Sequence, residues 1–486
     1  MTKEPIYWEG TVTEVQFPNR GKMIPAVEES AADTFISAPA SIHVKNVLPG
    51  QKVKVQVGRS GKRRREGRLI QILEQAPYET APLCPHAAFC GGCSYQTVPY
   101  DIQLQWKARQ IHDLLDPVLA GTDCVWEDIV PSPLQEGYRN KMEFSFGDEI
   151  KGGPLTLGLH KRGAFHDIIT TDHCRIVHPD FQAILQETLR VFTELNTSHY
   201  NSYTHEGYLR HLVLRRSFHD ESLLVNLVTT GGQEADLNIW KDALLSLPCA
   251  SHIRGILHTT NDRDADVVQN DAMEILYGEA SLIEELLGLT FEIFPFSFFQ
   301  TNSKGAEQLY SVVRDFAGDV SGAEVFDLYC GTGTIAQILA GAGAKSVTGI
   351  EIVEEAVEAA RINAKRNHLD NCHFIAGDVL KQIDTLSVHP DTVILDPPRD
   401  GIHPKALPKI LNFSPDRFVY VSCKPTSLVR DLPAFMEAGY RVERIRPVDM
   451  FPFTVHVETV CCLYHQKKDF ISVPYEPKNA DYLKNR

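Results

Sequence analysis

Short hydrophobic runs alternate with polar residues through the first 75 positions. The two-residue period and the β-branched content typical of strands occur at residues 8–15, 38–44, 52–58 and 68–74. In the third run Lys52 and Lys54 share one face of the strand, and Val53 and Val55 share the other. Several short strands without helices between them predict an OB-like β-barrel over residues 1–75.

The middle of the chain mixes the strand and helix periods. Residues 76–100 are rich in proline, cysteine and glycine, whereas residues 102–119 have the apolar spacing of a helix. Residues 211–217 and 222–229 have the composition of paired strands. We therefore expect a central α+β domain over residues 76–290.

Strand and helix patterns alternate regularly from about residue 320. Helical patterns at 334–340 and 354–367 are interleaved with strand patterns at 324–329, 346–351, 392–396 and 417–422. This order predicts a parallel sheet covered by helices, in a Rossmann-like domain over residues 291–486. The expected fold class is a multidomain α/β protein.

Composition adds limits on class and location. Hydrophobic residues make up 43% of the chain and charged residues 23%, as in ordinary globular proteins. No apolar run reaches the length of about 18 residues that a membrane span needs. The first residues lack the basic and apolar regions of a secretory signal, which predicts a cytoplasmic protein without a membrane partner.

The charge is uneven along the chain. A net charge of −15 argues against a nucleic-acid partner. Residues 51–68, however, contain eight basic residues and one acidic residue. Because phosphate attraction acts over only about 8–10 Å, such a run can bind nucleic acid on an otherwise acidic protein. A solvated turn at residues 60–67 is the alternative.

A glycine-rich turn joins the first strand of the C-terminal sheet to its helix. Gly331 and Gly333 permit a tight turn against a ligand, but Ala336 breaks the pattern that cradles a pyrophosphate. Glu351 ends the next strand, where its carboxylate can accept hydrogen bonds from both hydroxyls of a ribose, and Asp378 ends a third strand. This series resembles the S-adenosylmethionine site of class I methyltransferases.

Reactive side chains follow the next two strands. Asp396 begins an Asp-Pro-Pro-Arg sequence, and Cys423 follows the fifth strand, so both lie at the carboxyl edge of the sheet. A thiolate that adds to C6 of a pyrimidine makes C5 able to attack an electrophilic methyl group. Cys423 is the candidate nucleophile, and a buried core cysteine is the alternative. We expect a nearby cation, Arg399 or Lys424, to stabilise its thiolate near neutral pH.

The same reaction needs a base that removes the C5 proton. Residues 455–463 form an apolar strand pattern that contains one glutamate, Glu458. A buried carboxylate is costly unless it is used or paired, so Glu458 is the candidate base and an ion pair with an arginine is the alternative. His456 lies on the same strand face and is expected to orient a neighbour or to pack.

A cysteine cluster lies in the middle of the chain. Cys84, Cys90 and Cys93 form a C-x5-C-x2-C pattern, and Cys174 is a candidate fourth ligand. Thiolates at this spacing can hold zinc or a [4Fe–4S] cluster, and the spacing alone does not separate the two.

Together these residues resemble the RNA (uracil-5-)-methyltransferase family, from the N-terminal barrel to about residue 465. The resemblance implies formation of 5-methyluridine, with Cys423 as the nucleophile and Glu458 as the base. It implies that the barrel is a TRAM domain that binds RNA. It assigns S-adenosylmethionine binding to Gln300, Tyr329, Thr334, Glu351, Asp378 and Asp396.

The bacterial 23S ribosomal-RNA branch of this family carries a [4Fe–4S] cluster on a matching cysteine set. The resemblance therefore favours iron–sulfur over zinc at Cys84, Cys90, Cys93 and Cys174. Two positions depart from the family pattern: Lys424 stands where asparagine is usual, and Phe453 where a polar residue is common. Both concern contacts to the target base rather than the reaction.

We therefore expect a monomeric cytoplasmic enzyme, without an obligate protein partner, that methylates uridine C5 in 23S ribosomal RNA. A transfer-RNA uridine methyltransferase is one alternative. A non-catalytic RNA-binding or assembly protein is another, although the intact Cys423 and Glu458 count against it. Cytosine-5 methylation is disfavoured, because those enzymes place a Pro-Cys nucleophile where Asp396 stands here or use two cysteines.

Overall fold

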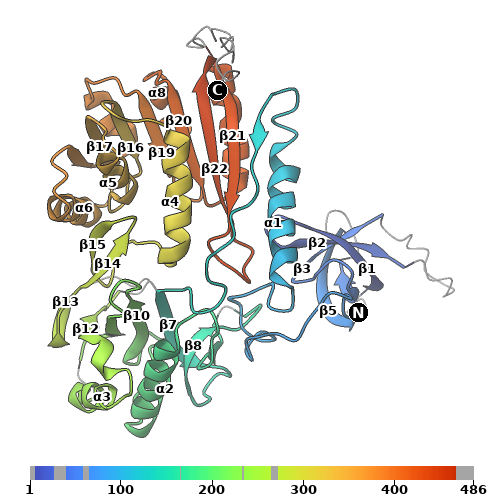
Figure 1. The fold of residues 1–486 in the computed structure, drawn as a ribbon. Coiled ribbons are helices and arrows are strands. Elements are labelled where there is room, and N and C mark those ends of the chain that lie inside the picture. Colours follow the sequence, from blue (N-terminus) through green and yellow to red (C-terminus); the bar gives the residue numbers. More distant parts are fainter. Residues whose placement is uncertain are drawn as a thin grey trace, which may run out of the picture.

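The computed structural model describes residues 6–26, 40–58, 65–164, 166–232, 235–263 and 272–466. Three β-structures organise this part of the chain (Figure 1): a barrel, a seven-stranded sheet and an eight-stranded sheet. None of the helices described is long and apolar enough to cross a membrane.

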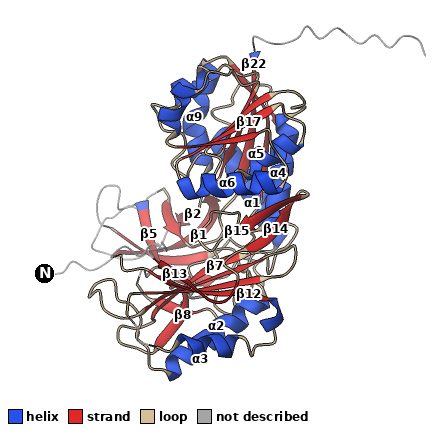
Figure 2. Cartoon of the chain, turned by 90° about the vertical axis from the view of Figure 1, so that its left-hand side faces the viewer, coloured by secondary structure: helices blue, strands red, loops and turns tan. Residues whose placement is uncertain are grey.

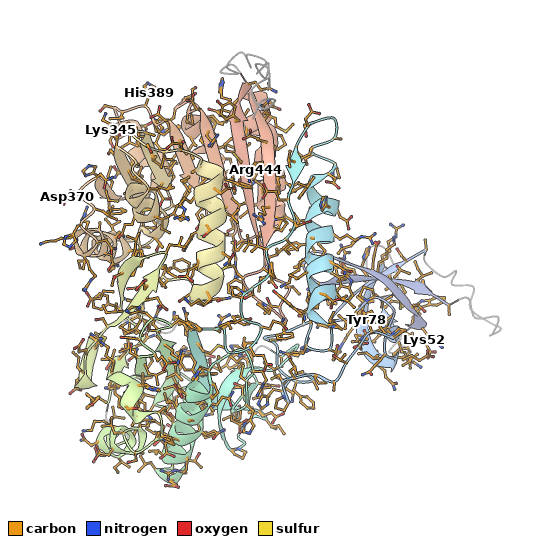
Figure 3. The ribbon with its side chains drawn as sticks, viewed as in Figure 1. Lys52, Tyr78, Lys345, Asp370, His389 and Arg444 are labelled. Atoms are coloured by element: carbon orange, nitrogen blue, oxygen red, sulfur yellow. The ribbon has the colours of Figure 1, made fainter. Side chains whose placement is uncertain are left out.

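The N-terminal strands close into a small barrel, as the strand pattern predicts. Its order is β1-β2-β3-β5-β4, with β1 (Ile6–Gln16), β2 (Arg20–Pro25), β3 (Ile42–Lys45), β4 (Lys52–Val57) and β5 (Glu66–Glu74). Val53 and Val55 are fully buried, and Lys52 (Figure 3) and Lys54 lie on the outside. These two lysines pair with Glu74 and Glu9 on neighbouring strands, so the outer face of β4 is locally neutralised. Most of the basic run, residues 59–64, lies outside the described residues.

The central sheet has the order β13-β12-β11-β10-β7-β8-β9. Its strands are β7 (Lys141–Asp148), β8 (Leu155–His160), β9 (Ile168–Thr170), β10 (Leu209–Arg216), β11 (Leu223–Thr229), β12 (Ile253–Thr260) and β13 (Ala272–Gly278). The predicted pairing of β10 with β11 is confirmed and is antiparallel. Helices α2 (Pro179–Glu194) and α3 (Leu237–Leu244) cover the face turned away from the C-terminal sheet (Figure 2).

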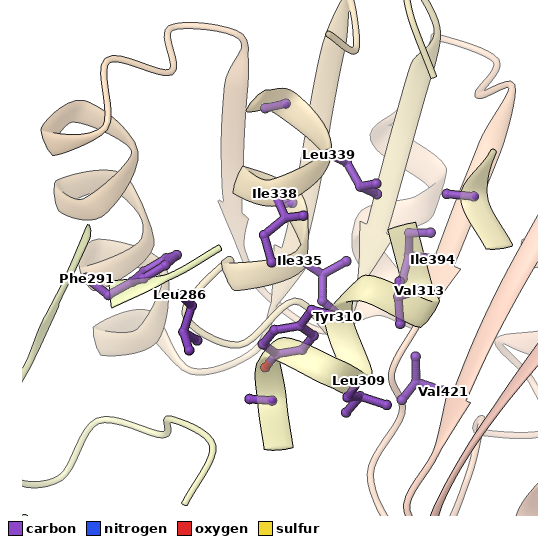
Figure 4. Packing of buried hydrophobic residues seen from close by; sticks show 14 of the residues in the cluster. Leu286, Phe291, Leu309, Tyr310, Val313, Ile335, Ile338, Leu339, Ile394 and Val421 are labelled. Carbon is purple, nitrogen blue, oxygen red and sulfur yellow. The ribbon is translucent and has the colours of Figure 1, made fainter. Parts of the chain in front are cut away.

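The C-terminal sheet has the order β18-β17-β16-β19-β20-β22-β21-β6. The predicted parallel strands are β16 (Glu324–Leu328), β17 (Ser346–Glu351), β18 (Cys372–Ala376), β19 (Thr392–Leu395) and β20 (Arg417–Ser422). Antiparallel to these runs β22 (Glu458–His465), which pairs with β20 and with β21 (Tyr440–Val448). Around the sheet lie α4 (Ser303–Ala317), α5 (Thr334–Gly341), α6 (Glu354–Arg366), α7 (Val379–Gln382), α8 (Leu407–Leu411) and α9 (Pro425–Glu437). Leu309 and Val313 of α4 share one core with Ile335, Ile394 and Val421 (Figure 4).

The middle of the chain does not form one unit over 76–290, which corrects the expected domain boundaries. Helix α1 (Tyr100–Leu115) buries Ile111 and Leu115 in the core of the C-terminal sheet, and β6 (Val125–Trp126) pairs with β21. Arg444 of β21 (Figure 3) bonds Glu127 beyond β6 at 2.6 Å and Asp315 of α4 at 2.6 Å. The hairpin of β14 (Leu282–Leu286) and β15 (Leu289–Ile293) also packs in this core. Apolar spacing predicts a helix or strand, but it does not reveal the surface against which that element packs.

Candidate active site

One cavity of about 1530 Å³ opens at the carboxyl ends of the parallel strands. It is bounded by the segment 294–301, which leads into α4, by the loops that follow β16 to β20, and by the connection from β21 to β22. It gathers most of the site residues expected from the sequence: Gln300, Tyr329, Glu351, Asp378, Asp396, Cys423 and Glu458. Ligands bind at this edge of α/β sheets, so the position agrees with the chemistry of these side chains.

The turn after β16 has a backbone that favours glycine. Gly331 has a φ of 54° and Gly333 a φ of 71°, and even Tyr329 between strand and turn has a φ of 68°. A Cβ atom on Gly333 would lie 2.5 Å from the ring of Phe374 and 3.0 Å from Ala360. This close packing lets the turn curl beneath the cavity and start α5 at Thr334.

Two carboxylates end the neighbouring strands. Glu351 accepts hydrogen bonds from the N–H groups of Gly331 at 3.0 Å and Val353 at 2.9 Å, one on each oxygen. Each oxygen retains a second lone pair for a ligand hydroxyl. Asp378 caps α7 by accepting from the N–H of Leu380 at 2.9 Å, and it also borders the cavity.

Thr334 lies in a smaller adjoining cavity that also reaches Gln300, Tyr329 and Asp396. The same cavity exposes a residue that the sequence analysis did not single out, Asp327. Burial raises the pKa of Asp327 to about 8. One of its oxygens accepts from the N–H of Ala336 at 2.9 Å, and Oδ1 has no hydrogen-bond partner among the described residues. An aspartate inside an apolar strand was the available signal.

Cys423 follows β20 and is half-buried. Burial, followed by the charges of Glu458 and Asp396, raises the pKa of the Cys423 thiol to about 11, and Arg399 opposes this. The expectation of a thiolate near neutral pH is therefore wrong for the protein without ligands, because desolvation and two carboxyl groups outweigh one cation. Lys424 is exposed at the start of α9 and is absent from the lining of the described cavity.

Glu458 is 6% exposed and begins β22 instead of lying inside the strand. Burial, and then the charge of Asp396, raises its pKa to about 8, while Arg399 acts in the opposite direction. Burial also raises the pKa of Asp396 to about 7. His456 faces the same cavity, and desolvation lowers its pKa to about 4, so its imidazole is neutral at physiological pH.

The four cysteines of the predicted cluster border one small cavity, together with His86 and Arg175. Their sulfurs are free thiols. Burial raises the pKa of Cys93 to about 11 and that of Cys174 to about 12. In the described part of the chain, no three His, Cys, Asp or Glu side chains are close enough to share one metal ion. The donor set is all thiol, as zinc and iron–sulfur sites require.

Comparison with known proteins agrees with this site. The family model described as tRNA (uracil-5-)-methyltransferase matches residues 288–467. An uncharacterized RNA methyltransferase of Clostridium tetani is 47% identical over 463 residues, which cover 95% of this chain and 98% of that protein. One from Caldanaerobacter subterraneus is 46% identical over 419 residues, or 86% of this chain and 92% of that protein.

A solved structure is similar along almost the whole chain. The crystal structure of Pyrococcus abyssi tRNA (uracil-54, C5)-methyltransferase with S-adenosyl-L-homocysteine has a TM-score of 0.71 and 28% sequence identity, and covers 94% of this chain and 100% of that chain. With a multidomain fold that ends in a Rossmann-like domain, and relatives identical at nearly half of their positions, the chain belongs to the RNA (uracil-5-)-methyltransferase family.

Proposed function

We propose that this enzyme methylates C5 of uridine through a covalent adduct at Cys423, with Glu458 as the base. The observation that carries the proposal is that both residues border the same cavity as the glycine turn and Glu351. A nucleophile, a base and a nucleoside-binding edge within one cavity are what C5 methylation requires.

The cofactor side of the cavity is proposed to hold S-adenosylmethionine, which supplies an electrophilic methyl group when bound. Glu351 would accept hydrogen bonds from the ribose hydroxyls, and Asp378 would face the base. The methionine portion would lie nearer the reactive side chains, beside Asp396. The remaining proposed contacts are made by Gln300, Tyr329 and Thr334.

In the proposed mechanism, the Cys423 sulfur bonds to C6 of uracil and the electron pair of the C5=C6 bond moves toward O4. C5 then takes the methyl group. Glu458 removes the proton from C5, and the returning electron pair expels Cys423. A pKa raised to about 8 suits a base that works near neutral pH. Because the pKa of Cys423 is about 11, its proton must leave as the ligands bind.

Trapping the adduct tests this assignment. Cys423→Ala should abolish both methylation and the adduct while cofactor affinity stays nearly unchanged. Glu458→Gln should still allow addition and methyl transfer, so a methylated RNA–protein adduct should accumulate on a denaturing gel with labelled RNA. Free methylated product from Glu458→Gln at the wild-type rate would remove Glu458 from the role of base.

We also propose that Cys84, Cys90, Cys93 and Cys174 hold a [4Fe–4S] cluster, with zinc as the alternative. Zinc draws four thiolates to within about 3.8 Å of one another, since Zn–S bonds are about 2.3 Å long. The absence of so tight a group among the described residues favours a larger group, around which the four thiols surround a shared space. Anaerobically purified protein should be brown with about four irons per chain. Colourless protein with one zinc would contradict the assignment.

For the substrate we propose 23S ribosomal RNA, supported by the cysteine set and by an N-terminal barrel in the place of a TRAM domain. Transfer RNA is the second candidate, because the matching family model and the Pyrococcus abyssi enzyme both carry transfer-RNA names. Mass mapping of both RNA classes from a deletion strain separates the two. Loss of 5-methyluridine from transfer RNA alone would replace the ribosomal assignment.

A further inference from the structure

The loop that follows β19 brings an unpaired cation into the reactive half of the cavity. Arg399 borders the cavity together with Asp396, Cys423 and Glu458. Within the described residues its guanidinium forms no hydrogen bond or ion pair, although its backbone carbonyl does. An arginine without a partner among buried carboxyl groups is available to a substrate or to a developing negative charge.

Helix α9 holds this loop in place. The Ser427 hydroxyl donates to the carbonyl oxygen of Arg399 at 2.6 Å. Asp431 accepts from the N–H of Ile402 at 3.0 Å and from the Tyr420 hydroxyl at 2.9 Å, both on Oδ2. Asp431 is 2% exposed, and its buried charge is compensated by these bonds and by Arg430.

The loop also packs against α9 without spare room. Gly401 has a φ of 74°, and a Cβ atom there would lie 2.4 Å from Arg430 and 2.9 Å from Ser427. Because α9 starts at Pro425, two residues after Cys423, one helix fixes both the nucleophile and the loop that carries Arg399. The spacing between thiol and guanidinium is thus built into α9.

We propose that Arg399 is a further catalytic residue that stabilises negative charge during addition to uracil, and that Ser427 and Asp431 are positioning residues for it. This inference rests on the proposed function. As the S–C6 bond forms, the electron pair of the C5=C6 bond moves toward O4, and the negative charge passes from sulfur to the ring. A fixed cation in the cavity wall stabilises both the thiolate and the enolate without rearranging.

The other charged or titratable groups around Cys423 do not supply this stabilisation. Glu458 and Asp396 are carboxyl groups and raise the pKa of the thiol, whereas Arg399 lowers it. His456 faces the cavity as a neutral imidazole. Lys424 is exposed on the start of α9. Arg399 is therefore the group placed to favour the charged nucleophile.

The test measures alkylation of Cys423 by iodoacetamide against pH, read from the mass of the Cys423 peptide. This readout does not depend on methyl transfer. Arg399→Gln should raise the midpoint of alkylation by roughly one pH unit. Ser427→Ala should raise it by a smaller amount, and the double variant should match Arg399→Gln, because Ser427 acts through Arg399. Asp431→Asn should resemble Ser427→Ala.

Thr426→Ala is the matched control: it removes an exposed hydroxyl from the same turn of α9 and should leave the midpoint unchanged. In methylation assays Arg399→Gln should lower kcat at least tenfold while the cofactor KM changes little. An unchanged midpoint in Arg399→Gln would overturn the catalytic role, and additive shifts in the double variant would overturn the positioning role. If the midpoints shift as expected but the wild-type enzyme methylates no uridine, the proposed function fails and the electrostatic assignment stands.

Discussion

At the scale of single residues, the site is defined by carboxyl groups that burial keeps protonated. Burial raises the pKa of Asp327 to about 8, of Asp396 to about 7 and of Glu458 to about 8. All three border the main cavity or the smaller one beside it. S-adenosylmethionine carries a sulfonium and an ammonium group, so its binding favours the ionised form of each carboxyl group.

We expect cofactor binding to release protons and to tighten as pH rises. Below about pH 7 the carboxyl groups are neutral and must lose protons before they attract a cationic ligand, whereas above about pH 8 they are already charged. Affinity should therefore rise between pH 6 and 8 and then level off. Calorimetry in two buffers of different ionisation enthalpy measures the released protons. Equal heats in the two buffers would contradict the prediction.

At the scale of elements, the turn between β16 and α5 is the most constrained connection of the site. Gly333→Ala must accept a φ of 71° and displace the Phe374 ring. We expect a loss of about 2–4 kcal/mol in the free energy of unfolding, together with weaker cofactor binding. Urea denaturation and equilibrium binding measure the two effects.

Gly341→Ala is the control, because this glycine ends α5 and has nothing within 4 Å of an added Cβ. It should leave stability unchanged or raise it by up to about 1 kcal/mol. Similar losses in both variants would show that α5 tolerates no added side chain, and that the turn has no special role.

At the scale of the whole molecule, the connection from β21 to β22 is held by several distant parts of the chain. The backbone N–H groups of Ser94 and Tyr95, just after the cysteine cluster, donate to the carbonyl of Phe453 at 3.0 and 2.9 Å. Lys107 of α1 bonds Asp449 at 2.7 Å, and both side chains are fully buried. This connection carries Phe451 and His456 into the cavity, so barrel-side and cluster-side segments shape the site.

Breaking the Lys107–Asp449 pair should be costly. Lys107→Met leaves Asp449 buried without its cation, and we expect a loss of about 3–5 kcal/mol in unfolding free energy. The double variant Lys107→Met/Asp449→Leu removes both charges and should recover most of that loss. Urea denaturation of both variants decides the matter. A double variant as unstable as the single one would mean that the hydrogen bonds of Asp449 and Lys107 to the loop backbone dominate.

Some elements escape sequence reasoning for local reasons. Strand β2 has no hydrophobic alternation, because its inward positions are Gly21, Met23 and Pro25, and a glycine there leaves room for Val47. Helix α1 is recognisable, but its buried face includes Gln103, Lys107 and Gln110, which look like solvent-facing residues. Each becomes intelligible only when the neighbouring element is known.

The sequence by itself determined the order of strands and helices in the C-terminal domain, its glycine turn, and the cysteine, glutamate and aspartate side chains at its strand ends. These are local properties, because periodicity and turn chemistry act over a few residues. Only the tertiary structure decided that α1 and β6 join that domain, that α9 fastens the Arg399 loop, and that Cys423 is a thiol with a pKa of about 11. Burial and charge act between groups far apart in the chain, so protonation at the site depends on the complete fold.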